Sequence, residues 1–186
     1  MASVLIPLAE GFEELEAVTL IDLLRRAKIN VVSASLGELA VTASRGVVLV
    51  ADKKLNEVMD QQFDMLILPG GQPGTNHLNA DPRIHALIKK MRMNNQAVAA
   101  ICAAPRVLAT AGILNGCRAT CYPGTLTTKD WPEIKLSEEE DVVIDGDILT
   151  SKGPGTAISF SLAIVEYLKG KHTRQQVEDE LVRSAS

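Results

Sequence analysis

Two hydrophobic patterns alternate along the chain. Short apolar or β-branched runs predict strands, and longer stretches with apolar residues three or four apart predict helices. The predicted strands are 4–8, 31–35, 65–68, 97–101, 118–121, 142–144 and 148–150, with 47–50 as a hairpin arm. The predicted helices are 15–27, 82–93, a segment from Cys102 through Leu108, 154–169 and a last amphipathic segment at 173–182. Pro82 suits a first helical position, and Gly170 suits a helix C-terminus.

Strands that alternate with helices are typical of an α/β fold, in which helices cover both faces of a mostly parallel sheet. No repeat or Pro/Gly/Ser linker divides the chain, so we expect one domain over 1–186. Ligands of such sheets bind beyond the carboxyl ends of the strands. Three turns are therefore candidates for the site: the Glu-rich turn after the first strand, the Pro-Gly-Gly turn after Leu68, and the turn at Cys102.

Composition narrows the function classes. The chain has 186 residues, of which 46% are hydrophobic and 23% charged, and its formal net charge is −4. It has no basic block of the kind that binds nucleic acid, no apolar run of the ~20 residues needed to span a membrane, and no signal-peptide pattern. Its three cysteines have no metal-ligand spacing and form an odd set, which argues against a disulfide framework. We therefore expect a cytoplasmic protein without a metal.

Cys102 is the strongest candidate for chemistry. A wholly apolar strand delivers this cysteine, small residues follow it, and Pro105 begins a helix. This pattern predicts a nucleophile elbow with sulfur in place of a serine oxygen. The N–H groups of the helix N-terminus would lower the thiol pKa and could stabilise an oxyanion. The alternative is a buried, inert cysteine, and the pattern alone leaves both possibilities open.

Acidic residues and paired glycines mark the other two turns. Glu13 and Glu14 suit a first helical turn because they complement the helix dipole. Glu16 shares a face with Leu20, so its carboxyl is expected to point inward, keep its proton and hydrogen-bond a thiolate. Gly70 and Gly71 would let backbone N–H groups approach a ligand closely. The turn at 153–156 has the same character and is more typical of a structural turn.

The remaining sulfur and imidazole groups carry less weight. A Cys–His dyad would need a histidine beside Cys102, and the three histidines (His77, His85 and His172) lie in helical or loop settings typical of the surface. Cys117 and Cys121 are expected on one face of a strand, as core-facing or partly exposed thiols.

Several runs together resemble the ThiJ/PfpI superfamily, in particular its Parkinsonism-associated protein deglycase branch and bacterial relatives. The runs occur in the order of the family and extend over essentially the whole chain. They are 11–16, 22–27, 44–47, 68–71, 99–105 and 149–156.

The resemblance implies a flavodoxin-like sandwich and a homodimer in which the first helix takes part. It implies that Cys102 is the nucleophile and that Glu16 is its protonated partner. The Pro-Gly-Gly turn (Gly70 and Gly71) and Ala103 would bind the substrate, with the N–H groups of Gly71 and Ala103 facing an oxyanion. Arg45, together with the partner subunit's Arg26, would hold an anion there.

One position departs from the family pattern. Some members of this branch have a histidine before the proline of the strand after the elbow helix, and Tyr122 stands here. A phenol can donate a hydrogen bond but is a poor general base near neutral pH. We therefore expect the Glu16–Cys102 pair to handle protons.

By this resemblance, the chain acts on a small reactive dicarbonyl or a glycated adduct, as a deglycase or as a glyoxalase that gives a 2-hydroxy acid, without a cofactor. Cys102 would add to the aldehyde, and Glu16 would move a proton between adjacent carbons or to the leaving group. The rival hypothesis is a redox sensor or holdase chaperone whose Cys102 oxidises to the sulfinic acid, with little turnover. A cysteine protease is disfavoured because no histidine is suitably placed.

Overall fold

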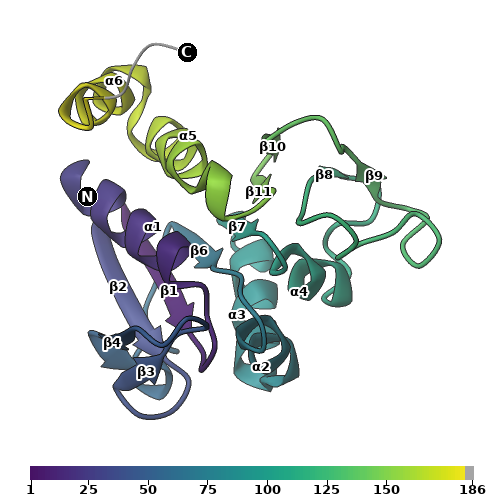
Figure 1. Ribbon diagram of the computed structural model, residues 1–186, viewed down its shortest axis with the longest axis horizontal. Coiled ribbons are helices and arrows are strands. Elements are labelled where there is room, and N and C mark those ends of the chain that lie inside the picture. Colours follow the sequence, from purple (N-terminus) through teal and green to yellow (C-terminus); the bar gives the residue numbers. More distant parts are fainter. Residues whose placement is uncertain (183–186) are drawn as a thin grey trace.

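A seven-stranded sheet forms the centre of the molecule, with the strand order β10-β11-β7-β6-β1-β2-β5 (Figure 1). The computed structural model describes residues 1–182. Five of the pairings are parallel, and only β10 runs antiparallel, against β11. The strands are β1 (Ser3–Leu8), β2 (Asn30–Ser35), β5 (Lys53–Lys54), β6 (Met65–Leu68), β7 (Ala97–Ile101), β10 (Val142–Asp145) and β11 (Ile148–Ser151). The predicted α/β fold with a mostly parallel sheet is confirmed.

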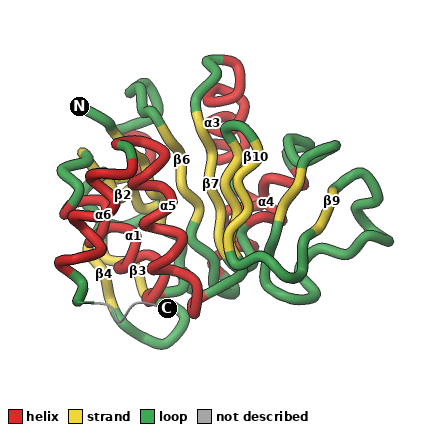
Figure 2. The backbone as a smooth tube through the Cα atoms, turned by 90° about the horizontal axis from the view of Figure 1, so that it is seen from above, coloured by secondary structure: helices red, strands yellow, loops and turns green. Residues whose placement is uncertain are grey.

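Six helices cover the two faces of this sheet (Figure 2). They are α1 (Glu14–Arg26), α2 (Gly74–Ala80), α3 (Pro82–Met93), α4 (Pro105–Thr110), α5 (Ala157–Lys169) and α6 (Lys171–Glu180). One hydrophobic cluster joins α1, α5 and α6 to the sheet, and a second joins α2, α3 and α4 to the other face. Side chains alternate between the faces along each strand, so Val4 and Ile6 belong to the first cluster and Leu5 to the second.

Small two-stranded sheets and single turns complete the chain. The predicted hairpin is present as β3 (Ala40–Thr42) and β4 (Val48–Val50), and β8 (Arg118–Ala119) pairs with β9 (Lys135–Leu136). Two 3-10 turns follow β5 and β11, namely η1 (Leu55–Glu57) and η2 (Pro154–Thr156). None of the helices within 1–182 combines the length and apolar character that a membrane crossing requires.

The structure differs from the sequence analysis in two places: the strand predicted at 118–121, and a helix at 74–80 that was not predicted. The expected strand at 118–121 ends at Ala119 and lies outside the main sheet, because the chain then turns until Tyr122 N–H donates to the Cys102 carbonyl at 2.8 Å. Cys117 and Cys121 therefore do not share a strand, although both pack against the second cluster. Helix α2 was not predicted, because Leu78 is its only large buried apolar residue and gives no helical periodicity.

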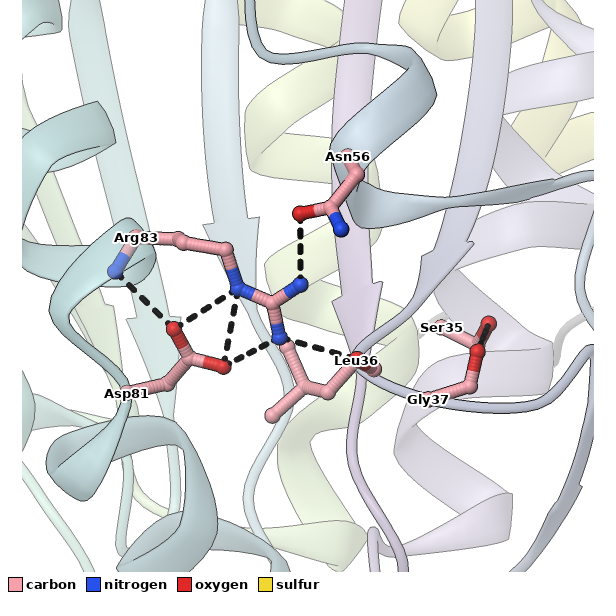
Figure 3. Close-up of polar contacts among 6 residues, drawn as sticks. All are labelled: Ser35, Leu36, Gly37, Asn56, Asp81 and Arg83. Atoms are coloured by element: carbon pink, nitrogen blue, oxygen red, sulfur yellow. Dashed lines mark hydrogen bonds and ion pairs between the residues drawn. The ribbon is translucent and has the colours of Figure 1, made fainter.

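Arg83 joins three segments that are far apart in the sequence (Figure 3). It lies in the first turn of α3, where Asp81 caps the helix and pairs with its guanidinium. The same guanidinium donates to the Leu36 carbonyl beyond β2 at 2.8 Å and to Asn56 Oδ1 in η1 at 2.7 Å. Because the pair is largely shielded from water, Arg83 fixes the chain that leaves β2 against α3.

Candidate active site

The three turns singled out in the sequence meet at one place on the sheet. Strand β1 lies between β2 and β6: the chain passes from β1 to β2 and β5 on one side, and then crosses back to β6 and β7 on the other side. This reversal of strand order creates a crevice outside the carboxyl ends of the strands, where ligands of open α/β sheets bind. Glu16 follows β1, Gly70 and Gly71 follow β6, and Cys102 follows β7.

Cys102 has the backbone geometry of a nucleophile elbow. Its φ is 64°, a left-handed conformation that costs a residue with a Cβ roughly 1–2 kcal/mol. The residue is held on both sides, because its N–H donates to the Ser151 carbonyl at 2.9 Å and its own carbonyl accepts from Tyr122 N–H. This turn brings the thiol to the edge of the crevice, with 9% of the residue exposed.

Glu16 lies directly beneath the thiol and is fully buried. Its Oε2 accepts a hydrogen bond from Gly70 N–H at 2.8 Å, and its carboxyl also contacts the Cys102 thiol. The Gly70 carbonyl in turn accepts from the N–H of Glu13, the residue that precedes α1, at 2.9 Å. The start of α1 and the end of β6 are thus joined by two hydrogen bonds, which fix the carboxyl against the sulfur.

Both glycines of the Pro-Gly-Gly turn are required by close packing. A Cβ on Gly70 would lie 2.6 Å from Cys102 Cβ and 2.9 Å from Glu16 Oε2. Gly71 has a φ of 94°, and a Cβ there would lie 2.4 Å from the Glu13 nitrogen. Since real carbon contacts are never this short, no larger residue fits at either position while the turns stay in place.

The thiol and the carboxyl beneath it influence each other's protonation. Burial raises the pKa of Glu16 to about 7. Burial, and then the nearby Glu16 charge, raises the pKa of Cys102 to about 12, although hydrogen bonds from the N–H groups of Gly71 and Ala103 oppose the increase. The expectation of a thiol pKa lowered by its helix is therefore wrong, because burial outweighs the N–H groups. The pair loses its first proton near pH 7 and holds the second far above it.

A cavity of about 340 Å³ opens above the sulfur. Of the site residues inferred from the sequence, it is lined by Gly71, Cys102, Ala103, Arg45 and Tyr122. Gly70 does not line it, because its N–H is bonded to Glu16. The cavity is also lined by residues to which the sequence analysis gave no binding role: Glu13, Ser44, Gln72, Thr125 and Pro154. Glu13 and Gln72 lie in or beside the candidate turns, and Ser44 and Pro154 lie in the runs 44–47 and 149–156, whereas no sequence signal indicated Thr125.

The β3–β4 hairpin brings Ser44 and Arg45 to the cavity. Ser44 N–H donates to the Phe12 carbonyl at 2.8 Å, and Ser44 Oγ donates to Glu13 Oε2 at 2.9 Å. Arg45 N–H donates to Glu14 Oε1 at 3.0 Å. The acidic start of α1 therefore does more than complement the helix dipole, since it also anchors the hairpin.

Arg26 and the histidines, which the sequence analysis also considered for the site, do not line the cavity of a single chain. Arg26 pairs with Asp22 and Glu180 near the end of α1, so its expected place in the partner subunit's site stays a prediction. His77 Nδ1 contacts the Glu10 carbonyl and His85 Nε2 contacts the Asn79 carbonyl. No histidine lines the cavity, so the described residues form no Cys–His dyad there.

The chain matches the model of the DJ-1/PfpI family over residues 2–167. It is 41% identical over 181 residues to protein DJ-1 homolog B of Arabidopsis thaliana, an alignment that covers 96% of this chain and 41% of that protein. The chain thus spans less than half the length of that relative. It is 38% identical over 175 residues to the glutathione-independent glyoxalase DJR-1.2 of Caenorhabditis elegans, covering 91% of this chain and 89% of that protein.

The fold is similar to that of solved structures over its full length. The crystal structure of Drosophila melanogaster DJ-1beta superposes with a TM-score of 0.93 at 38% sequence identity, and the alignment covers 99% of each chain.

Proposed function

Because the chain belongs to the DJ-1/PfpI family, we propose that it is a cysteine-dependent enzyme that acts on reactive dicarbonyls. It converts a small dicarbonyl such as methylglyoxal to the 2-hydroxy acid, or removes the corresponding adduct from a thiol or an amine. The observation that carries this proposal is the thiol of Cys102, held at a φ of 64° directly over the buried carboxyl of Glu16. The glyoxalase name of a relative with 38% identity supports the choice of reaction.

The Glu16–Cys102 pair provides the nucleophile. When the pair holds a single proton, that proton can sit on the Glu16 carboxyl, which leaves the sulfur as a thiolate. Hydrogen bonds from Gly71 and Ala103 N–H favour this arrangement, and the Gly70 N–H fixes the carboxyl. A thiolate is the reactive form of cysteine, and it adds to the aldehyde carbon to give a hemithioacetal. Because the pKa of Cys102 is the higher of the two, the thiolate arrangement is the minor one near neutral pH, and it is replenished as the sulfur adds to the aldehyde.

The same N–H groups suit the charge that develops on the substrate. Gly71 and Ala103 both line the cavity, and their N–H groups face the sulfur that the substrate oxygen will adjoin. Backbone donors fixed in this way stabilise an oxyanion without having to reorganise during the reaction. Arg45 adds a positive charge at the cavity wall for an anionic substrate group or product. The proposed chemistry uses no metal and no organic cofactor.

The proposal includes a homodimer and a reducing, cytoplasmic compartment. Helix α1 exposes two large apolar side chains, Leu15 at 51% and Val18 at 44%, which a second copy of the chain could cover. The dimer is also the arrangement that would bring the partner subunit's Arg26 towards Arg45. All three cysteines are free thiols, as a reducing compartment would keep them.

The test is methylglyoxal consumption with lactate as product, measured for the wild type beside Cys102→Ala. Turnover that the substitution abolishes, with an unchanged circular dichroism spectrum, supports the proposal. Equal consumption by the Cys102→Ala variant contradicts the mechanism. Negligible turnover by a folded wild type whose Cys102 is reduced and titratable would instead favour the redox-sensor or chaperone alternative.

A further inference from the structure

Two carboxyl groups belong to this site, and only one of them can touch a substrate. Glu16 is fully buried, its Oε2 is bonded to Gly70 N–H, and it is not part of the cavity wall. Glu13 lies on the same turn and does line the cavity, beside Cys102 and Ala103. A group that exchanges protons with substrate carbon atoms must reach them directly or through one water. Glu16 therefore contacts the Cys102 sulfur, whereas Glu13 lines the cavity in which the substrate would bind.

Glu13 is held at its backbone and at one carboxylate oxygen. Its N–H donates to the Gly70 carbonyl at 2.9 Å, and its Oε2 accepts from Ser44 Oγ at 2.9 Å. No residue within 1–182 forms a hydrogen bond to its Oε1, which leaves that oxygen able to bind a ligand. One carboxylate oxygen is therefore bonded to the hairpin, and the other has no protein partner in a residue that lines the cavity.

We propose that Glu13 is the catalytic residue that carries the proton between the two adjacent carbons of the dicarbonyl substrate. This inference rests on the proposed function and differs from the expectation in the sequence, which gave that step to Glu16. The two carboxyl groups then have different roles. Glu16 shares a proton with the sulfur and helps to form the hemithioacetal, and Glu13 acts on the carbon atoms.

The step balances without an oxidant or reductant. In the hemithioacetal, Cys102 Sγ is bonded to C1, which carries a hydroxyl and one hydrogen, and C2 is still a carbonyl. Glu13 takes the C1 proton, the C1–H electron pair becomes a C1=C2 bond, and the C2 carbonyl oxygen receives the displaced π pair and a proton from water to give an enediol. Glu13 then returns its proton to C2, while the C1 hydroxyl gives its proton back to the hydroxide left by that water and becomes a carbonyl. The product is a Cys102 thioester, and water cleaves it to the 2-hydroxy acid and the free thiol.

The electrostatics of the turn agree with this division. The negative charge of Glu13 is one of the influences that raise the pKa of Glu16, after the larger effect of burial. The charge of Glu13 therefore favours a proton on Glu16, the carboxyl that shares its proton with the sulfur. Tyr122 also lines the cavity, but a phenol is a poor base for this step.

The experiment compares Glu13→Gln with Glu14→Gln in methylglyoxal turnover. Glu14 is the matched control because it is the next residue, has the same charge and also accepts from Ser44 Oγ, but does not line the cavity. We expect Glu13→Gln to lower kcat by about 100-fold or more, the usual effect of losing a general base, with KM changed by less than about threefold. Because Glu14 anchors the hairpin that carries Arg45, we expect Glu14→Gln to raise KM but to leave kcat within about threefold of the wild type, whereas a purely structural role for the acidic turn would lower kcat in both variants.

A second readout follows the intermediate. Native mass spectrometry of the intact protein mixed with methylglyoxal, with Cys102→Ala as the blank, should find more covalent substrate adduct in Glu13→Gln than in the wild type, because the adduct forms and then stalls. Wild-type kcat in Glu13→Gln, an equal loss in both variants, or loss of the adduct itself would overturn the role of Glu13. Absence of both turnover and adduct in the wild type would overturn the proposed function, and the role of Glu13 with it.

Discussion

Replacing Glu16 by glutamine should change how the stability of the protein depends on pH. A carboxyl loses its proton at about 4.5 when unperturbed, and burial raises this pKa to about 7 in the folded chain. Between these two values the folded state binds the proton and the unfolded state does not, so the free energy of unfolding falls as pH rises. The contribution is fully present below pH 4.5 and is lost by the time pH passes 7. Glutamine resembles the protonated carboxyl and has no charge to bury.

The size of the effect follows from the two pKa values. They differ by roughly 2.5 pH units, and each unit corresponds to about 1.4 kcal/mol, which gives about 3 kcal/mol in total. Relative to the wild type, Glu16→Gln should therefore gain about 3 kcal/mol in the free energy of unfolding between pH 4.5 and pH 8. Turnover should fall strongly in the same variant, because an amide cannot share a proton with the sulfur.

The assay is urea unfolding followed by circular dichroism at several pH values, with protein concentration held fixed because the proposed dimer would make stability depend on it. Glu38→Gln is the control, since Glu38 is an exposed residue that pairs with Lys54 on the surface. Its stability curve should run parallel to that of the wild type. If the Glu16→Gln and wild-type curves also run parallel across this range, the carboxyl is not kept protonated by burial and the reasoning fails.

Two further substitutions test the packing that positions the site. Gly70→Ala should lower turnover sharply and cost about 1–3 kcal/mol in the free energy of unfolding, because the new Cβ would lie 2.6 Å from Cys102 Cβ. Kinetics and stability equal to those of the wild type would contradict this tight contact. Arg83→Met should cost about 2 kcal/mol in the free energy of unfolding by urea, because it removes the hydrogen bonds that the guanidinium donates to Leu36 O, Asn56 Oδ1 and the Asp81 carboxylate. A loss below about 0.5 kcal/mol would show that these bonds do not stabilise the fold.

The main elements of the fold could be predicted because their patterns are local. The strand at 97–101 is apolar throughout, and the helix at 82–93 has both a proline start and buried residues at helical spacing. Elements without such a pattern were missed. Helix α2 begins at Gly74, whose place is set by contact, since a Cβ there would lie 2.6 Å from the Phe12 nitrogen.

The sequence by itself indicated which turns meet at the candidate site, because the carboxyl ends of neighbouring parallel strands lie at the same edge of a sheet. Only the tertiary structure decided what those residues do to one another. It placed the Glu16 carboxyl beneath the sulfur and raised the pKa of both groups, and it brought Ser44 and Glu13 to one cavity wall. Strand order and burial set these relations. Strand order and burial both depend on contacts between residues tens of positions apart, and a local pattern of apolar and polar residues does not predict such contacts.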